Sequence, residues 1–163
     1  MKKNYRTLAY IGLGSNLQNP ITQIAIALRE LALLPESDLQ QHSGLYLSRP
    51  MGPPDQPVYV NAVASIKTHL EAEELLNHLQ SIENQHGRER LGEHWGPRTL
   101  DLDILNFGNK KINSTRLNVP HPGVRLREFV LYPLQEIDKN LIIAGVGRVD
   151  RLSQKCYANG LAL

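Results

Sequence analysis

Two aspartates separated by one residue are the side chains of this sequence that point most directly to chemistry. Asp101 and Asp103 lie within an otherwise apolar run over residues 100–105. Side chains of a strand alternate between its two faces, so both carboxylates are expected on one face, with Cα atoms about 6.6 Å apart. Such a pair can share one hard cation or hold two, and without a cation the carboxylates repel each other. The spacing indicates a metal site, although a half-exposed strand with an acidic outer face would give the same pattern.

Basic side chains on both sides of this strand could bind the anion that such a cation carries. They are Arg88, Arg90 and Arg98 before the aspartates, and His121, Arg125 and Arg127 after them. The planar guanidinium group fits phosphate oxygens, and several arginines together with a divalent cation suit a polyphosphate. The combination favours a nucleotide bound with metal, with ordinary surface charge as the alternative.

The elements that must position these residues follow from hydrophobic periodicity. Strands are expected at residues 7–13, 39–47, 58–66 and around 101–105, and helices at 20–34 and 71–86. A loop rich in proline and glycine spans 49–57, Gly87 is placed to end the second helix, and Gly108 with Asn109 predicts a hairpin turn leading to Ile112. This order predicts an α+β fold, a ferredoxin-like βαββαβ sandwich whose antiparallel sheet carries both helices on one face, followed by a C-terminal extension. The other face of the sheet would be free to bind a ligand.

Side chains on two of these elements suggest further contacts. Tyr59 and Asn61 share the more polar face of the third strand. Gln80 and Glu83 project together from one flank of the second helix, which by spacing alone indicates a solvated surface.

Known nucleotide-binding signatures are incomplete in this sequence. Gly12 and Gly14 lack the third glycine of a dinucleotide fingerprint, and no Gly-Lys-Ser/Thr triplet is present. The favoured interpretation is a tight turn over residues 14–16 that ends the first strand. A nucleotide site would therefore have to use the acidic strand and the arginines.

Length and composition favour a single domain over residues 1–163. A chain of 163 residues can bury about 70% of its unfolded surface. The single Cys156 cannot form an internal disulfide, and the N-terminal apolar stretch is too short for a signal peptide, which together predict a cytoplasmic protein. No run approaches the roughly 20 apolar residues of a membrane helix, and a net charge of +2 gives no indication of nucleic-acid or membrane binding.

At the level of whole motifs the sequence resembles the 6-hydroxymethyl-7,8-dihydropterin pyrophosphokinases of folate biosynthesis. The resemblance rests on AYIGLGSNL at 9–17, YVNA at 59–62, GPRTLDLDI at 96–104 and VPHP at 119–122, and weakens after about Ile137. It implies transfer of the terminal pyrophosphate of ATP to the hydroxymethyl oxygen of the pterin, with AMP released and two Mg²⁺ bridging the phosphates. ATP and the pterin would be its small-molecule partners, and a monomer is expected.

The same resemblance implies roles residue by residue. Asp101 and Asp103 would bind both Mg²⁺ ions and would form the catalytic set with Arg88 and Arg98. The nucleotide would be bound by Gln80, Glu83, Arg88, Arg90, Trp95, Arg98, Ile104, His121 and Arg127. The pterin would be bound by Ser48, Arg49, Met51, Tyr59, Asn61, Trp95, Asp101 and Phe129.

Within the implied pterin site, Asn61 would read the edge of the ring, which Tyr59 and Phe129 would hold. Ser48 and Met51 would contribute backbone groups, so the identity of their side chains would matter less. By residue type alone the two aromatics could be core residues, and His121 could simply order a turn. Pro122 stands where some members have tyrosine, a departure that concerns the adenine and ribose contacts.

Two other classes of protein fit parts of the pattern. An RNA-binding module would share the predicted sheet, but it stacks bases on strand aromatics where this chain has aspartates that repel phosphate. A metal-dependent nucleotide hydrolase would use the same aspartates with water as the acceptor. The polar face that carries Tyr59 and Asn61 favours an organic acceptor over water.

Overall fold

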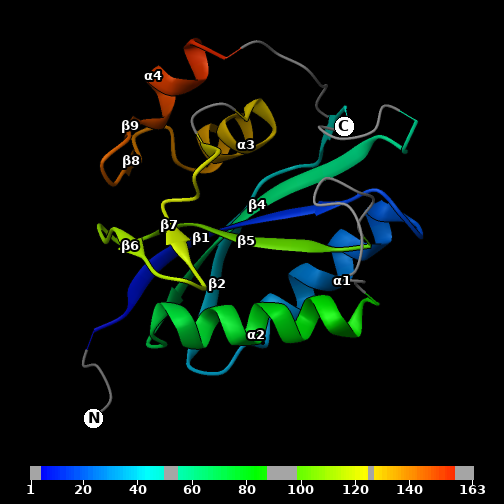
Figure 1. Cartoon of the computed structure of the whole chain (residues 1–163), viewed down its shortest axis with the longest axis horizontal. Coiled ribbons are helices and arrows are strands. Elements are labelled where there is room, and N and C mark those ends of the chain that lie inside the picture. The colour runs from blue at the N-terminus through cyan, green and yellow to red at the C-terminus, as the bar shows by residue number, and fades with distance from the viewer. Residues whose placement is uncertain (1–4, 50–54, 88–98, 125–126, 157–163) are drawn as a thin grey trace.

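The computed structural model describes residues 5–49, 55–87, 99–124 and 127–156. Its central sheet contains β1 (Thr7–Ser15), β2 (Ser37–His42), β3 (Tyr46–Ser48), β4 (Tyr59–Thr68) and β5 (Asp101–Phe107). The strand order is β2-β4-β1-β5, with β3 also paired to β4, and every pair is antiparallel (Figure 1). With β2 and β3 counted as one broken strand, this is the order of a ferredoxin-like sandwich, as predicted. The arrangement makes β5 an edge strand.

Two helices cover one face of the sheet, as the periodicity predicted. They are α1 (Pro20–Ala32) and α2 (Ala72–Gln85) (Figure 1). Pro20 occupies the first turn of α1, where a missing N–H costs nothing, and a capping box between Glu71 and Glu74 begins α2. Gly87 follows the end of α2 with a φ of 80°, which glycine adopts without strain. The main core lies between these helices and the sheet.

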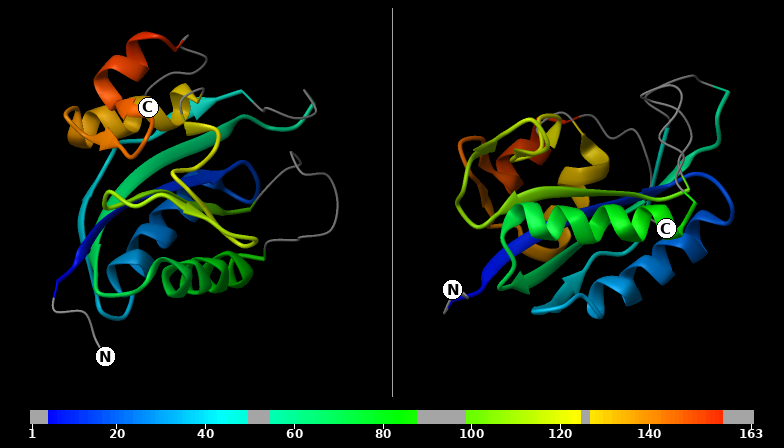
Figure 2. Two further views of the ribbon diagram at one scale, coloured as in Figure 1. Left: turned by 60° about the vertical axis from the view of Figure 1, so that its left-hand side comes forward. Right: turned by 60° about the horizontal axis from the view of Figure 1, so that its bottom comes forward.

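The second face of the sheet is partly covered, contrary to the expectation of a free face. The covering elements are α3 (Glu128–Asp138), the short pair β8 (Ile142–Ile143) and β9 (Gly147–Arg148), and α4 (Val149–Gln154). Figure 2 shows them on the side of the sheet opposite α1 and α2. Tyr10, Val63 and Leu105 give this face an apolar region, and buried side chains of α3 such as Leu131 and Leu134 pack on it. The C-terminal extension is therefore part of the layered structure.

Three local expectations were wrong, two because of pairing with a distant segment and one because of a different local pairing. β1 continues into the predicted turn at 14–16 and ends at Ser15, because Gly14 pairs with both neighbouring strands. The expected strand at 39–47 breaks at Ser43, whose hydroxyl accepts the N–H of Val63 at 2.9 Å. Gly108 does begin a turn, but the segment that follows it, β6 (Ile112–Asn113), pairs with β7 (Asn118–Val119) and not with β5.

Across the described ranges, no helix combines the length and apolar character needed to cross a membrane.

Candidate active site

A row of three residues crosses the centre of the sheet and organises the site. On β1, Gly14 is directly opposite Asn61 of β4 on one side and Asp101 of β5 on the other. Directly paired residues place their side chains on the same face, so the amide and the carboxylate flank a position without a side chain. A Cβ on Gly14 would lie 3.4 Å from Asn61 Oδ1 and 3.8 Å from Tyr59 Cδ1. Gly14 therefore leaves space on this face of the sheet between the Asn61 amide and the Asp101 carboxylate.

The two aspartates lie on the same face of β5, as the alternation predicted. Leu102 and Ile104 are buried in the main core, and Asp101 and Asp103 are half-buried on the other side. The pKa of Asp103 is raised well above its ordinary value by burial, by the charge of Asp101 and by the charge of Glu83. An approaching cation would relieve this repulsion. The carboxylate pair is thus electrostatically suited to a cation.

A cleft of about 280 Å³ opens beside β5. Its lining comes from α2, from β5 and from the segment over 116–122, as follows: Leu76, Gln80, Glu83, Asp101, Leu102, Asp103, Ile104, Arg116, Leu117, Asn118, His121 and Pro122. The cleft thereby unites four residues predicted for the nucleotide site, namely Gln80, Glu83, Ile104 and His121, with both aspartates. An edge strand leaves outward backbone groups unpaired by the sheet, so this cleft offers hydrogen-bonding groups of the main chain as well.

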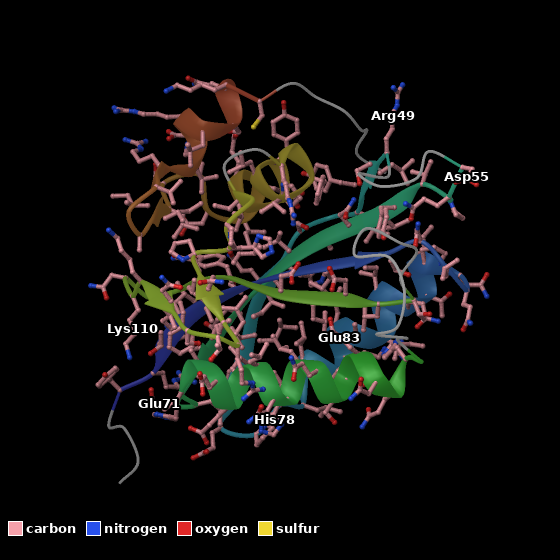
Figure 3. The ribbon with its side chains drawn as sticks, in the orientation of Figure 1. Arg49, Asp55, Glu71, His78, Glu83 and Lys110 are labelled. Atoms are coloured by element: carbon pink, nitrogen blue, oxygen red, sulfur yellow. The ribbon has the colours of Figure 1, made fainter. Side chains whose placement is uncertain are left out.

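Glu83 is buried, although its helical spacing had indicated a solvated surface. Its side chain extends from α2 toward β5 in Figure 3, and Glu83 Oε2 accepts the N–H of Leu102 at 2.8 Å. This bond shows that Leu102 turns its N–H away from β1. Because backbone groups alternate in direction along an antiparallel strand, Ile104 also turns its N–H and C=O toward the cleft. Ile104 thus presents main chain to the cleft while its side chain fills the core.

His121 is positioned by the backbone around it. Its N–H donates to the carbonyl of Leu105 at 3.2 Å, and its ring Nδ1 accepts the N–H of Gly123 at 3.1 Å. Its Nε2 lies 3.9 Å from Asp103 Oδ2. Burial, and next the charge of Arg127, lower the pKa of His121 to about 4. The ring is therefore neutral at pH 7, with its proton on Nε2, and does not contribute the positive charge that the sequence suggested.

Arg127 supplies positive charge near this group. Its guanidinium lowers the pKa of both His121 and Asp103, which places the charge close to each of them. The Cζ atom lies 5.8 Å from the centre of the Phe129 ring, within range of a cation–π interaction. A Cβ on Gly123 would come within 2.6 Å of Arg127 Nε, so only glycine allows this close approach.

Asn61 is buried, and its amide has a defined orientation. Its Nδ2 donates to Ser48 Oγ at 2.8 Å and to the carbonyl of Tyr46 at 3.2 Å. Both amide hydrogens are thus used, and no described residue donates to Oδ1, which lies beside Gly14. A buried acceptor without a donor is costly unless a ligand supplies one. The Ser48 side chain thus helps to orient this amide, although the identity of that side chain was expected to matter less.

Only some of the remaining residues predicted for the site lie near it in the described structure. Tyr59 lies at the start of β4 next to Gly14, and Phe129 is half-buried at the start of α3, where it packs against the second core. Arg49 is exposed, and its side chain points away from the ribbon in Figure 3. Five predicted residues lie outside the described ranges: Met51, Arg88, Arg90, Trp95 and Arg98. Arg125 also lies outside them.

The sequence did not predict that Arg116 and Asn118 line the cleft. Arg116 Nη2 donates to Asn77 Oδ1 at 2.6 Å and, more weakly, to Gln80 Oε1 at 3.4 Å. Arg116 and Asn118 line the cleft, but their segment has no recognisable spacing relative to the aspartates. The one available signal was that Arg116 is a further basic residue between the acidic strand and His121.

Within the described ranges, no three His, Cys, Asp or Glu side chains converge as a complete metal cage. Mg²⁺ commonly needs only one or two carboxylates when the phosphates of a substrate and water complete its coordination. The pair on β5 fits this second type of site.

Fold and site define a ferredoxin-like α+β domain with a carboxylate pair beside a cleft at the sheet edge. Comparison with known proteins identifies the family of this domain. Residues 10–139 match the family described as 7,8-dihydro-6-hydroxymethylpterin-pyrophosphokinase (HPPK). The chain belongs to this family.

Individual relatives agree with this placement. The chain is 51% identical over 135 residues to the 2-amino-4-hydroxy-6-hydroxymethyldihydropteridine pyrophosphokinase of Haemophilus influenzae, covering 83% of this chain and 84% of the relative. It is 45% identical over 152 residues to the enzyme of the same name from Pseudomonas aeruginosa, covering 93% of each.

Solved structures support the fold. The chain is similar to HPPK-DHPS of Plasmodium falciparum, crystallised with pterin and p-hydroxybenzoate, with a TM-score of 0.73 and 15% sequence identity. The match covers 95% of this chain but only 44% of the solved one, so this chain spans less than half of that protein.

Proposed function

We propose that this protein transfers pyrophosphate from ATP to the hydroxymethyl group of 6-hydroxymethyl-7,8-dihydropterin, releasing AMP, as a step of folate biosynthesis. Membership of the HPPK family supports the reaction class. The observation that carries the proposal for this chain is the row Asn61, Gly14 and Asp101. It sets a buried amide acceptor and a cation-binding carboxylate on opposite sides of an open glycine.

The pterin would lie on the Asn61 side of this row. A pterin carries N–H donors along one edge, and Asn61 Oδ1 is a buried acceptor that needs a donor. The Tyr59 ring beside Gly14 offers an apolar surface for the flat heterocycle, and Phe129 would contribute a second one. Ser48, Arg49, Met51 and Trp95 complete the proposed pterin site.

The nucleotide would occupy the cleft beside β5. The outward N–H and C=O of Ile104 can form hydrogen bonds with the donor and acceptor edge of a purine. An added strand would use the same backbone groups of an edge strand. Gln80, Glu83 and Arg116 line the same space. Arg127 and the neutral His121 would lie near the phosphates, and Arg88, Arg90, Trp95 and Arg98 are proposed as further nucleotide contacts.

Asp101 and Asp103 would hold two Mg²⁺ ions together with the phosphates. The raised pKa of Asp103 supports this role, because burial and the charges of Asp101 and Glu83 outweigh the opposing charge of Arg127. When bound, Mg²⁺ would neutralise phosphate charge and make the pterin hydroxyl easier to deprotonate.

The residues of the chain then act mainly by alignment. The pterin hydroxymethyl oxygen forms a bond to the β-phosphorus of ATP, the bond from that phosphorus to the oxygen shared with the α-phosphorus breaks, and the hydroxyl proton passes to water. AMP leaves with the bridging oxygen. Such a transfer needs no protein nucleophile, so positioning by Asn61 on one side and charge from Arg127 on the other account for the expected contribution of the protein.

The decisive experiment incubates the purified protein with ATP, Mg²⁺ and the pterin, and resolves the nucleotide products. AMP formed only when the pterin is present would support the proposal. ADP would indicate a phosphotransferase, AMP or ADP without pterin a hydrolase, and no turnover a binding protein. We further propose that the protein acts as a single-domain, cytoplasmic monomer without nucleic-acid or membrane partners, which light scattering and localisation can test.

A further inference from the structure

The break between β2 and β3 exposes a backbone group that the sheet does not use. Ser43 N–H donates to the carbonyl of Val63 at 2.8 Å, and Ser43 Oγ accepts the N–H of Val63 at 2.9 Å. These two bonds replace the strand ladder at the break. The next residue, Gly44, therefore points its N–H away from β4 and requires another acceptor.

The acceptor comes from α3, on the second face of the sheet. Both carboxylate oxygens of Glu136 lie within hydrogen-bond distance of Gly44 N, at 2.9 and 3.2 Å. Tyr46 OH also donates to Glu136 Oε1, at 2.6 Å. One carboxylate thus fixes the start of β3 at two points, and bonds to a charged acceptor are stronger than bonds between neutral groups.

The segment fixed in this way holds the amide of Asn61. Tyr46 is paired with Asn61 across the two strands, and its carbonyl accepts one amide hydrogen. Ser48, two residues further along β3, accepts the other hydrogen. If β3 moved, both acceptors would move with it, and the amide could rotate so that its NH₂ group replaced the oxygen beside Gly14.

We infer that Glu136, which lies outside the proposed pterin site, is a positioning residue for pterin recognition. It anchors β3 so that Tyr46 and Ser48 hold Asn61 with its oxygen toward the ligand. The inference rests on the proposed function, because it takes Asn61 as the group that reads the pterin. Its effect belongs to pterin affinity and not to the nucleotide cleft, since none of these contacts involves β5.

The chain offers a closely matched control. Tyr10 OH donates to Asp138 Oδ2 at 2.7 Å, so a second tyrosine hydroxyl ties the same helix to the sheet at a point away from Asn61. Tyr46→Phe and Tyr10→Phe each remove one hydroxyl that donates to a carboxylate of α3. Loss of general stability would affect both variants, whereas loss of Asn61 positioning would affect only the first.

The test measures pterin Kd, the KM for ATP and the Tm for wild type, Tyr46→Phe, Glu136→Ala, Glu136→Gln and Tyr10→Phe. Glu136→Ala is expected to weaken pterin binding about tenfold, and Tyr46→Phe should weaken it by a smaller factor. The KM for ATP should be unchanged in both variants. Glu136→Gln, which keeps an acceptor for Gly44, should recover part of the affinity. In an Asn61→Ala background, Glu136→Ala should cause no further loss.

The outcomes separate the two proposals. Wild-type pterin affinity in Glu136→Ala, or an equal loss of affinity in Tyr10→Phe, would overturn the positioning role while the proposed function stood. A wild-type protein that does not bind the pterin at all would overturn both.

Discussion

At the scale of single residues, Asp103 illustrates how a site can oppose stability. Burial, followed by the charges of the neighbouring Asp101 and Glu83, raises the pKa of its carboxyl group. A raised pKa in the folded state means that the ionised form is less favourable there than in the unfolded chain. At neutral pH, and without a cation, Asp103 therefore destabilises the fold.

Asp103→Asn should accordingly abolish Mg²⁺-dependent turnover and raise the Tm of the metal-free protein. The side chain is 35% exposed, so water screens the repulsion, and the gain should be on the order of 1 kcal/mol, or a few degrees. The gain should decline as the pH falls below the raised pKa and disappear below the ordinary pKa of the unfolded chain, because Asp103 is then protonated in both states. Thermal unfolding between pH 4 and 8, with a parallel activity assay, measures both effects.

Asp150→Asn serves as the control for this experiment. The hydrogen bond from Arg148 lowers the pKa of Asp150, so removal of its charge should leave activity unchanged and should not raise the Tm. Near-normal turnover of Asp103→Asn would contradict its role at the metal, and a lower Tm would contradict the electrostatic argument.

Gly14 provides a second test at this scale. A methyl group there would lie 3.4 Å from Asn61 Oδ1 and 3.8 Å from Tyr59, in contact but without a clash. Gly14→Ala should therefore fold while narrowing the space for a flat ligand, raising the KM for the pterin roughly tenfold and leaving the KM for ATP unchanged. Steady-state kinetics with each substrate varied in turn measures this. Equal KM values for the pterin would show that the ligand does not approach Gly14.

At the scale of elements, the contact between α2 and β5 depends on one buried carboxylate. Glu83 is 2% exposed and accepts the N–H of Leu102 on the edge strand. Glu83→Ala should lower the free energy of unfolding by about 2 kcal/mol, because the amide loses its acceptor and the side chain leaves a gap. Glu83→Gln keeps an acceptor and should cost less.

Amide hydrogen exchange distinguishes this bond from general destabilisation. Exchange at Leu102 should accelerate in Glu83→Ala more than exchange at Leu13, which lies opposite it on β1. Equal acceleration at both positions would mean that Glu83 supports the fold as a whole and not the edge of β5.

At the scale of the whole molecule, the C-terminal extension shares a core with the sheet. Leu134 of α3 is fully buried in the cluster that includes Tyr10, Val63 and Leu105. Leu134→Ala should therefore cost about 3 kcal/mol within a single cooperative transition. The matched variant is Leu79→Ala, at a fully buried position of α2 in the main core. Calorimetry that shows two transitions for Leu134→Ala would mean that the extension folds separately, against the proposed single domain.

The sequence by itself determined features that depend on neighbouring residues. Alternation along a strand placed Asp101 and Asp103 on one face, and helical periodicity located α1 and α2 within a few residues. The succession of elements then led to the strand order of the sheet. These predictions succeeded because backbone geometry and apolar spacing are local properties.

Only the tertiary structure decided how distant segments complete the site. The pairing of Gly14 with both neighbours turned an expected turn into the floor of the site. The approach of α2 to β5 buried Glu83, whose spacing had indicated solvent, and brought Arg116 to the wall of the cleft. The orientation of the Asn61 amide depends on β3, and β3 in turn depends on α3. Each outcome comes from a contact between residues far apart in the chain, and such contacts leave no periodic signal in the sequence.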